Sequence, residues 1–220
     1  MSSPLETIYA KRFDDAEVVQ KHALWRPICA HLQRYVDPEG KVLDLACDRG
    51  YFIENISAGE KWATDIRDVS SNLSRDVTFV QHDGLTLGDV LPHRSFDVIF
   101  MSNYLEHLGS GDDVVAQLRV VHELLRPGGR VLVLQPNVRL VGGEYWDFID
   151  HKVALTERSL IEAAELAGLE TEKVVTRFLP FTTKSRFPQS EWLVRGYLAF
   201  PPAWLILGKQ TLYVGRRPER

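Results

Sequence analysis

The stretch VLDLACDRGYF, residues 42–52, decides how the rest of the chain is interpreted. Its first half is apolar, as expected for a strand whose two faces are both covered. Its second half is a turn that ends at Gly50, where the backbone can adopt conformations that other residues rarely take. A buried strand followed by such a turn predicts the first strand of an open parallel sheet, with a ligand-binding loop at its carboxyl end.

Short apolar segments recur along the chain and alternate with helical patterns. Strands are predicted at residues 41–46, 61–65, 77–82, 96–101, 130–134, 172–178 and 210–214. Four of the first five are rich in Val, Ile, Leu and Phe, which is typical of strands with helices on both faces. The alternation predicts an α/β fold with a largely parallel sheet.

Helices are predicted between these strands, at residues 14–36, after Gly50, at 114–125 and at 156–168. We expect the first helix to be interrupted near Pro27, because proline removes a backbone hydrogen bond. Thr156 is a favourable N-cap, and Gly168 is a favourable stop for the helix that follows it. We predict one domain over residues 1–220, with an N-terminal helical cap at 1–38 and an aromatic, proline-rich insertion at 180–208.

The composition is that of an ordinary globular protein, with 220 residues of which 45% are hydrophobic and 25% are charged. No signal peptide is evident at the start, and no apolar run is long enough to span a bilayer. Cys29 and Cys47 have no paired spacing, which argues against a disulfide framework or a zinc site. We therefore expect a cytoplasmic protein.

The net charge of −4 is unevenly distributed along the chain. Residues 173–220 carry a net charge of +7 and the remainder carries −11. A basic segment of this kind indicates either a solvated face or a surface that meets an anionic partner. Nucleic acid is disfavoured, because the chain is acidic overall and the basic segment shows no base-stacking pattern.

Polar residues follow several of the predicted strands. Asp65 ends the second strand, about 20 residues beyond the first, where an acidic side chain can hold the hydroxyl groups of a ribose. Ser102 and Asn103 end the fourth strand. Because the carboxyl ends of parallel strands share one edge of the sheet, the sequence predicts a nucleoside site there.

The motifs at these positions resemble those of the class I S-adenosylmethionine-dependent methyltransferases. The family's Asp-x-Gly-x-Gly-x-Gly motif appears as DLACDRG at residues 44–50, and further matches are VQHDG (80–84), FDVIFMSNYLEHL (96–108) and LLRPGGRVLV (124–133). The resemblance covers residues 42–168 and implies a Rossmann-like, doubly wound, mostly parallel seven-stranded sheet with helices on both faces and an antiparallel last strand. It implies that S-adenosylmethionine is bound by Asp44, Ala46, Cys47, Asp48, Gly50, Asp65, Ile66, His82, Asp83, Gly84, Ser102 and Asn103.

Two positions depart from the family motif, since Ala46 and Asp48 stand where glycine is expected. Aspartate is among the few residues that tolerate a positive φ, whereas Ala46 adds a methyl group where backbone approaches the ligand. Asp44 and Asp48 would repel a diphosphate, which argues against NAD and favours a cationic sulfonium. The loop is therefore interpreted as able to bind the cofactor.

Two histidines are candidates for the general base that a hydroxyl acceptor requires. His151, in WDFIDHKVALT, is either that base, oriented by Asp147 or Asp150, or a structural residue at a helix entry. His107 is a base, a metal ligand together with Glu106, or an ordering residue of its loop. Some relatives carry a Glu-x-x-Glu-His metal site, but Asn103 occupies the first position here, so no metal is predicted.

The insertion is rich in aromatic residues and is interrupted by Pro201-Pro202. It is interpreted as a closure of the core, a lid over the acceptor, a dimer face, or a contact of residues 182–217 with an anionic membrane. Tyr9, Lys11 and Arg12 are interpreted either as a lid over the cofactor or as a frayed terminus. The oligomeric state stays open.

The sequence thus predicts a methyltransferase that acts on a small-molecule or amphiphilic acceptor, such as a lipid-linked glycan intermediate. The alternative is a catalytically silent S-adenosylmethionine-binding subunit that regulates a partner. Ala46 and Asp48 favour the silent subunit, whereas the intact Asp65 and Asp83 favour the enzyme.

Overall fold

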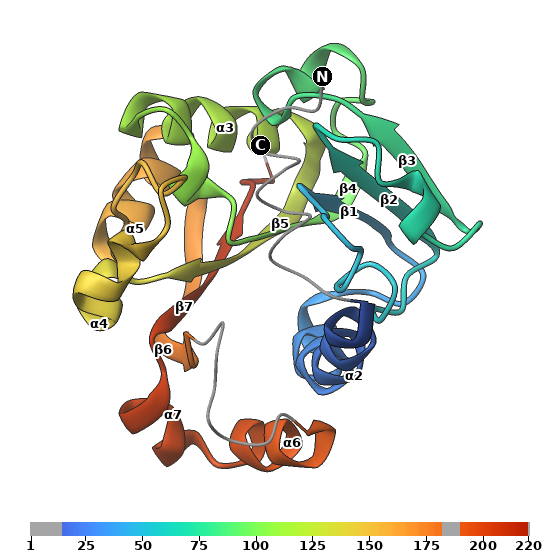
Figure 1. Cartoon of the computed structure of the whole chain (residues 1–220). Coiled ribbons are helices and arrows are strands. Elements are labelled where there is room, and N and C mark those ends of the chain that lie inside the picture. Colours follow the sequence, from blue (N-terminus) through green and yellow to red (C-terminus); the bar gives the residue numbers. More distant parts are fainter. Residues whose placement is uncertain (1–14, 182–189, 220) are drawn as a thin grey trace.

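A seven-stranded sheet forms the centre of the molecule (Figure 1). The computed structural model describes residues 15–181 and 190–219. The strands follow the order β3-β2-β1-β4-β5-β7-β6. Their bounds are β1 (Lys41–Leu45), β2 (Glu60–Asp65), β3 (Val77–Gln81), β4 (Phe96–Ser102), β5 (Leu125–Pro136), β6 (Glu170–Leu179) and β7 (Gln210–Arg216).

The strand directions are those of a doubly wound fold. β1 pairs in parallel with both β2 and β4, so the strand order reverses beside β1. β2 continues in parallel to β3, and β4 continues in parallel to β5. β7 runs antiparallel between β5 and β6. The predicted Rossmann-like, mostly parallel seven-stranded sheet with an antiparallel last strand is confirmed.

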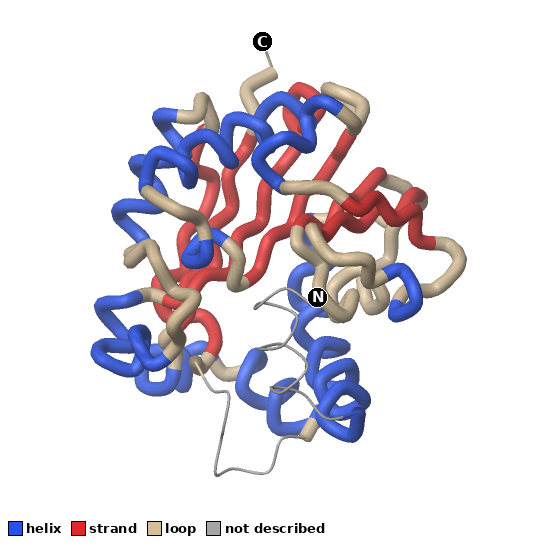
Figure 2. The backbone as a smooth tube through the Cα atoms, turned by 45° about the horizontal axis from the view of Figure 1, so that its top comes forward, coloured by secondary structure: helices blue, strands red, loops and turns tan. Residues whose placement is uncertain are grey.

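Helices cover both faces of this sheet (Figure 2). The α-helices of the described residues are α2 (Asp15–Leu32), α3 (Gly111–Leu124), α4 (Val138–Val141), α5 (Glu157–Leu166), α6 (Glu191–Ala199) and α7 (Pro201–Leu207). Short 3₁₀ turns lie at η1 (Gln33–Tyr35), η2 (Ser70–Asn72), η3 (Gly84–Asp89), η4 (Leu105–His107) and η5 (Gly142–Asp147). Two of these turns, η3 and η4, begin shortly after the ends of β3 and β4, so they lie at the edge where ligands bind in such folds.

The two faces of the sheet bury separate apolar clusters. On one face, Leu118 of α3 and Leu160 of α5 pack with Ile99 of β4. On the other face, Leu32 of α2 packs with residues of the opposite side of β1 and β4. Successive side chains of a strand point to opposite faces, so the continuous apolar runs of the sequence are buried on both sides.

The helix ends agree with the residues expected to cap them. The Thr156 side chain accepts a hydrogen bond from the backbone N–H of Ser159 and forms a capping box at the start of α5. Gly168, with φ of 83°, follows the end of the same helix. These two positions confirm the helix predicted between Thr156 and Gly168.

The first helix differs from its prediction. α2 runs through Pro27 without a break and ends at Leu32, where η1 takes over. Proline in a helix interior costs about 3 kcal/mol. Ile28, Cys29 and Leu32, all buried in the core beneath the helix, offset this cost.

Two further boundaries differ from prediction. After Gly50 the chain forms a series of turns instead of a regular helix before β2 begins at Glu60. The helix predicted to reach Leu125 ends at Leu124, and Leu125 is already the first residue of β5.

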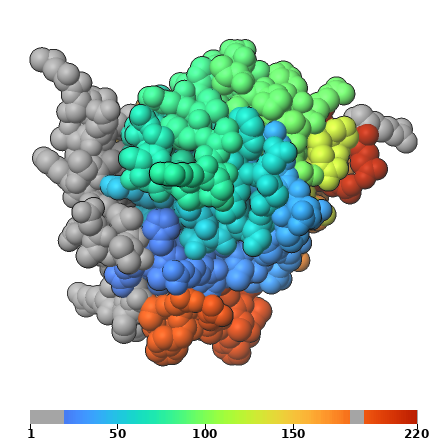
Figure 3. Space-filling view, turned by 90° about the vertical axis from the view of Figure 1, so that its right-hand side faces the viewer, coloured from blue at the N-terminus to red at the C-terminus, as the bar shows by residue number. Residues whose placement is uncertain are grey.

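The insertion between β6 and β7 contains α6 and α7 in its described part. Tyr197 of α6 donates its hydroxyl to the Phe178 carbonyl, and α6 packs beside α2 (Figure 3). Among the described residues, every helix is too short or too polar to cross a bilayer. The proposed lid residues Tyr9, Lys11 and Arg12 lie outside the described residues.

Candidate functional site

Four neighbouring strands end at one edge of the sheet and bring polar residues together there. The order β3-β2-β1-β4 places Asp83, Asp65, Asp44 and Ser102 at or just beyond the ends of adjacent strands. Strand order reverses between β1 and β4, which is the position where open parallel sheets bind ligands. The edge therefore combines the residues that the sequence assigns to a nucleoside.

The loop after β1 keeps the backbone of a glycine-rich turn although two of its three glycines are absent. Ala46, Asp48 and Gly50 all have positive φ, at 58°, 49° and 70°. These are the three positions that the family motif gives to glycine. The Cys47 N–H donates to the Thr64 carbonyl at 2.9 Å, which fixes the loop against β2. The fold imposes the conformation, and Ala46 adopts it at a cost of about 1–2 kcal/mol.

Asp44 is buried beneath this loop. Its Oδ2 accepts a hydrogen bond from the Ile53 N–H at 3.3 Å, so the carboxyl group holds the segment after Gly50 in place. Burial raises the pKa of Asp44 well above its ordinary value, and the nearby Asp65 and Asp48 carboxylates raise it further. Burial also raises the pKa of the Cys47 thiol, which makes that side chain an unreactive packing residue.

Asp65 is 4% exposed and is bound by a neighbouring arginine. Arg67 donates to both carboxylate oxygens of Asp65, from Nε to Oδ1 at 3.0 Å and from Nη2 to Oδ2 at 3.1 Å. The backbone N–H groups of Arg67 and Asp48 donate to the same two oxygens. Arg67 Nη2 also reaches Asp48 Oδ1 at 2.8 Å. Each oxygen of Asp65 thus accepts two hydrogen bonds from the protein.

The segment after β3 lies beside Asp65. The His82 N–H donates to the Asp65 carbonyl at 3.0 Å, and Asp83 caps η3 by accepting from the Leu85 N–H at 2.9 Å. Ile66 is 59% exposed and presents an apolar face next to these groups. An added Cβ at Gly84 would lie 2.2 Å from the Tyr104 hydroxyl, so a larger residue there would have to displace that side chain.

The end of β4 brings a second group of side chains to the same edge. Asn103 has a positive φ of 48° and donates from Nδ2 to Ser102 Oγ at 3.1 Å. This turn leads into η4, which carries Glu106 and His107. Ser102 and Asn103, both predicted to bind the cofactor, therefore also form the turn that positions Glu106 and His107.

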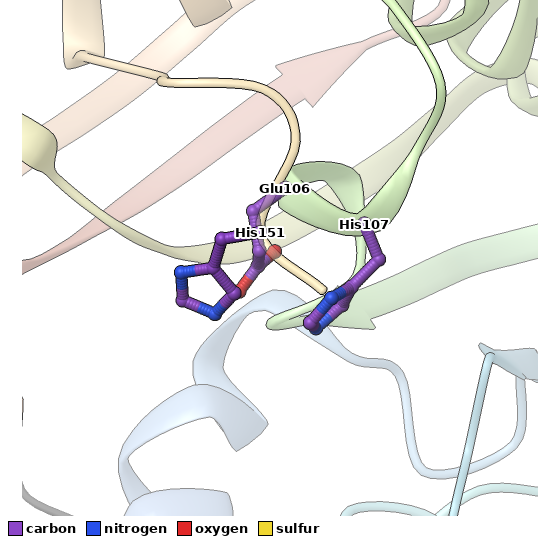
Figure 4. Close-up of side chains that lie close together, drawn as sticks. All are labelled: Glu106, His107 and His151. Atoms are coloured by element: carbon purple, nitrogen blue, oxygen red, sulfur yellow. The ribbon is translucent and has the colours of Figure 1, made fainter. Parts of the chain in front are cut away.

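His107 and His151 meet around Glu106, although they are far apart in the sequence (Figure 4). Their ring centroids are 5.1 Å apart. His107 Nδ1 lies 3.0 Å from the Asp150 carbonyl and 3.5 Å from the Asp150 carboxylate. His151 Nδ1 lies 2.7 Å from the Tyr145 carbonyl. The backbone carbonyl groups thus orient both rings.

Glu106 is 1% exposed, and burial raises the pKa of its carboxyl group. Its Oε2 accepts a hydrogen bond from Gln135 Nε2 at 3.1 Å, whereas its Oε1 has no hydrogen-bond partner. Its backbone carbonyl accepts from Lys152 N–H at 2.7 Å and Val153 N–H at 3.1 Å. These contacts attach the segment that contains His151 to η4.

Sequence reasoning missed two members of the site. Arg67 stands two residues beyond Asp65, in the run DIRD, and a cation so close to the ribose acid was the available signal. Gln135 lies within the apolar run RVLVLQP, where a buried amide needs a polar partner. That partner, Glu106, became visible only from the fold.

Comparison with known proteins agrees with this architecture. A family model described as a methyltransferase domain matches residues 20–174. No curated protein sequence matches the chain. Among solved structures, a methyltransferase dependent on S-adenosylmethionine from Archaeoglobus fulgidus is similar, with 18% identity, a TM-score of 0.61, and coverage of 86% of this chain and 93% of that one.

Two further solved structures share the fold. The complex of the Haloferax volcanii Trm112 methyltransferase activator with a putative methyltransferase matches with 18% identity and a TM-score of 0.67, over 93% of this chain and 95% of that one. A Mesorhizobium loti structure matches with 19% identity and a TM-score of 0.59, over 87% and 96%. At these identities the similarity shows the fold alone.

Proposed function

The chain belongs to the methyltransferase domain family, of the class I S-adenosylmethionine-dependent type, and we propose that it methylates an amphiphilic acceptor. The observation that supports this function best is the edge formed by β1, β2 and β3. There a loop with three positive φ values lies beside the buried Asp65. This combination suits the close approach of a nucleoside and the binding of its ribose.

The residues at this edge fit the cofactor once the Arg67 side chain withdraws. Departure of Nε and Nη2 would free one acceptor site on each oxygen of Asp65 while the backbone donors stay. Two acceptor sites match the two hydroxyl groups of a ribose. The exposed Ile66 offers an apolar surface for the adenine ring, and the carboxylate of Asp48 favours a cationic ligand.

S-adenosylmethionine supplies a methyl group that is activated by its positive sulfur. In the transfer, the acceptor atom would form a bond to the methyl carbon, the C–S bond would break, and its electron pair would stay on sulfur. A hydroxyl acceptor must also lose its proton, and alignment of the reacting atoms provides most of the remaining rate enhancement. The Nε2 atoms of His151 and His107 are the proposed proton acceptors, because each Nδ1 lies against a backbone carbonyl.

Exposed apolar side chains support an amphiphilic acceptor. Trp146 and Ile149 are 53% and 87% exposed, and both belong to the segment that leads to His151. A second exposed set lies on and beside α6 and α7: Trp192, Phe200, Leu205, Ile206 and Leu207. Apolar side chains of this kind on a surface indicate contact with a lipid or another apolar partner.

The cations of the described residues 190–217 contribute less to this proposal than the apolar residues do. Arg195, Lys209 and Arg216 form ion pairs with Glu191, Glu144 and Glu219. Arg217 is buried. We therefore expect peripheral membrane binding to depend on apolar insertion. Co-sedimentation with anionic vesicles at low salt tests this expectation. The double variant Leu205→Ser, Ile206→Ser should abolish binding. Binding that the double variant keeps, and that only higher salt removes, would contradict it.

Calorimetric titration with S-adenosylmethionine and S-adenosylhomocysteine tests the cofactor assignment. We expect both to bind, and Asp65→Asn to weaken binding at least about tenfold because an amide replaces a charged acceptor. Asp76→Asn is the matched control, since Asp76 is an exposed aspartate whose ion-pair partner is Lys61. Absence of binding to both nucleosides would overturn the assignment.

The silent-subunit alternative requires a separate test. An assay that uses radiolabelled S-adenosylmethionine and measures transfer of the labelled methyl group to extracted lipids distinguishes an enzyme from a binding protein. Cofactor binding without turnover on any lipid-linked or small-molecule acceptor would favour the regulatory subunit. Stabilisation by NAD in place of S-adenosylmethionine would contradict both.

A further inference from the structure

We propose that Glu106, His107 and His151 form a binding site for one divalent transition-metal ion. Each residue offers one ligand atom, and these atoms all lie within 4.8 Å of one another. Figure 4 shows the Glu106 carboxylate between the two imidazole rings. The donor set is one carboxylate oxygen and two imidazole nitrogens.

The Glu106 carboxylate has one buried acceptor atom without a partner. Its side chain is almost completely buried, yet Oε1 has no hydrogen-bond partner. An unpaired buried carboxylate oxygen is costly, and such atoms in native proteins usually bind a donor or an ion. The Gln135 amide holds only the other oxygen. A cation between the three side chains would satisfy the free oxygen.

The protonation pattern of the histidines is that of metal ligands. His107 Nδ1 lies 3.0 Å from the Asp150 carbonyl, and His151 Nδ1 lies 2.7 Å from the Tyr145 carbonyl. Because a carbonyl oxygen only accepts hydrogen bonds, each ring must carry its proton on Nδ1. Nε2 is then the lone-pair atom. Histidines that bind metals commonly donate their other N–H to a carbonyl or carboxylate in this way.

The backbone keeps the two halves of the site together. Lys152 and Val153 donate their N–H groups to the Glu106 carbonyl, at 2.7 and 3.1 Å. These bonds tie the residues directly after His151 to the turn that carries Glu106 and His107. The ligand atoms, which lie within 4.8 Å of one another, would have to move closer together to reach metal–ligand distances of about 2.0–2.2 Å.

The donor set selects the kind of metal. Imidazole nitrogen favours zinc and similar first-row ions, whereas magnesium and calcium prefer sites made of oxygen. Three protein ligands leave an open position, as in catalytic zinc sites. This part rests on the proposed function: the open position would take the hydroxyl oxygen of the acceptor and lower its pKa, so that its proton leaves to solvent. The bound metal would then replace the histidines as the means of deprotonation.

Metal titration of the tag-free full chain tests the site without any cofactor present. The protein is treated with a chelator and then titrated with Zn²⁺ against a chromophoric competitor, and with Co²⁺ to record its visible absorption. We expect one equivalent to bind and the Co²⁺ spectrum to be that of a four- or five-coordinate nitrogen and oxygen site. Glu106→Gln and His151→Gln should each weaken binding at least about tenfold.

His93→Gln is the matched control, because His93 is exposed and bonds to the Gly88 carbonyl outside the cluster. Binding of less than one equivalent, or equal affinity in Glu106→Gln, His151→Gln and the control, would overturn the site. If the two variants fail to fold, a six-coordinate Co²⁺ spectrum of the unaltered chain would overturn it as well. Metal binding with methyl transfer that does not change on metal removal would contradict only the role in acceptor activation.

Discussion

Arg67 binds both carboxylate oxygens of Asp65 and also reaches the carboxylate of Asp48. Nε and Nη2 lie 3.0 and 3.1 Å from Asp65 Oδ1 and Oδ2, and Nη2 also lies 2.8 Å from Asp48 Oδ1. The single positive charge of the guanidinium group is therefore shared between two nearby carboxylates and offsets only part of their charge. It also occupies the acceptor sites that a ribose would need. With the ribose placed on Asp65 as proposed, cofactor binding would be a competition between the ribose hydroxyls and an internal ion pair.

Replacing Arg67 should strengthen cofactor binding. A ligand that displaces the Arg67 side chain from Asp65 must break hydrogen bonds to a charged group, which reduces its binding free energy by about 1 kcal/mol or more. Arg67→Ala removes this cost and should therefore lower the Kd of S-adenosylhomocysteine about fivefold. The same change should lower the melting temperature, because Asp48 and Asp65 then repel each other. Calorimetry and thermal unfolding measure the two effects.

Arg75→Ala is the control for this experiment, since Arg75 is an exposed arginine of the same region. It should leave the Kd unchanged. A weaker affinity of the Arg67→Ala variant would mean that Arg67 contacts the bound nucleoside instead of competing with it.

The sheet was predictable from the sequence because its strands are buried on both faces. Runs such as FDVIFM at residues 96–101 have no polar face, and only a parallel sheet between helices gives such strands a place. Asp48 was expected to tolerate a positive φ, and the structure gives it 49°. The same conformation at Ala46 was not foreseen, because alanine gives no local preference for it.

The site was only partly predictable because its contacts join distant segments. Asn103 made the Glu-x-x-Glu-His pattern look incomplete, and spacing alone could not bring His151 next to Glu106. Backbone bonds from Lys152 and Val153 create that neighbourhood. Side-chain pairing between distant segments depends on the packed fold, and it cannot be predicted from sequence periodicity.

Glycine at position 46 should stabilise the protein. Ala46 holds φ at 58°, where a Cβ atom costs about 1–2 kcal/mol, and glycine removes that cost while gaining entropy in the unfolded state. We expect Ala46→Gly to raise the free energy of unfolding by about 0.5–1 kcal/mol. Urea unfolding measures it. Ala30→Gly, within α2, should lower the free energy of unfolding by a similar amount. Equal losses of stability in Ala46→Gly and Ala30→Gly would contradict the strain at Ala46.

A methyl group at position 84 should be destabilising, and removal of one hydroxyl should relieve it. A Cβ on Gly84 would lie 2.2 Å from the Tyr104 hydroxyl and 2.6 Å from Gln117 Oε1. Gly84→Ala should therefore cost about 1–3 kcal/mol of stability. Tyr104→Phe removes the nearer atom, so the double variant should recover part of that loss. A double-mutant cycle in urea checks it, and strictly additive losses would rule out the contact.

His31 should make the protein sensitive to mild acid. Its ring packs against Phe178 and Trp204, and burial together with the charge of Arg34 lowers its pKa from 6.5 to about 4. The unfolded chain therefore binds a proton at a higher pH than the folded chain does. The stability that comes from neutral His31 is complete above pH 6.5 and is lost progressively as the pH falls toward 4.

A variant without the imidazole isolates this contribution from the other titrating groups. Between about pH 7.5 and about pH 5, the free energy of unfolding should fall by about 1 kcal/mol less in His31→Gln than in the unaltered chain, after allowance for solvent screening. Urea unfolding at the two pH values gives the difference, and the shared loss from other groups cancels. Equal losses in both proteins would show that His31 takes up its proton without opening the contact among α2, β6 and α7, and the cause of acid sensitivity would then lie elsewhere.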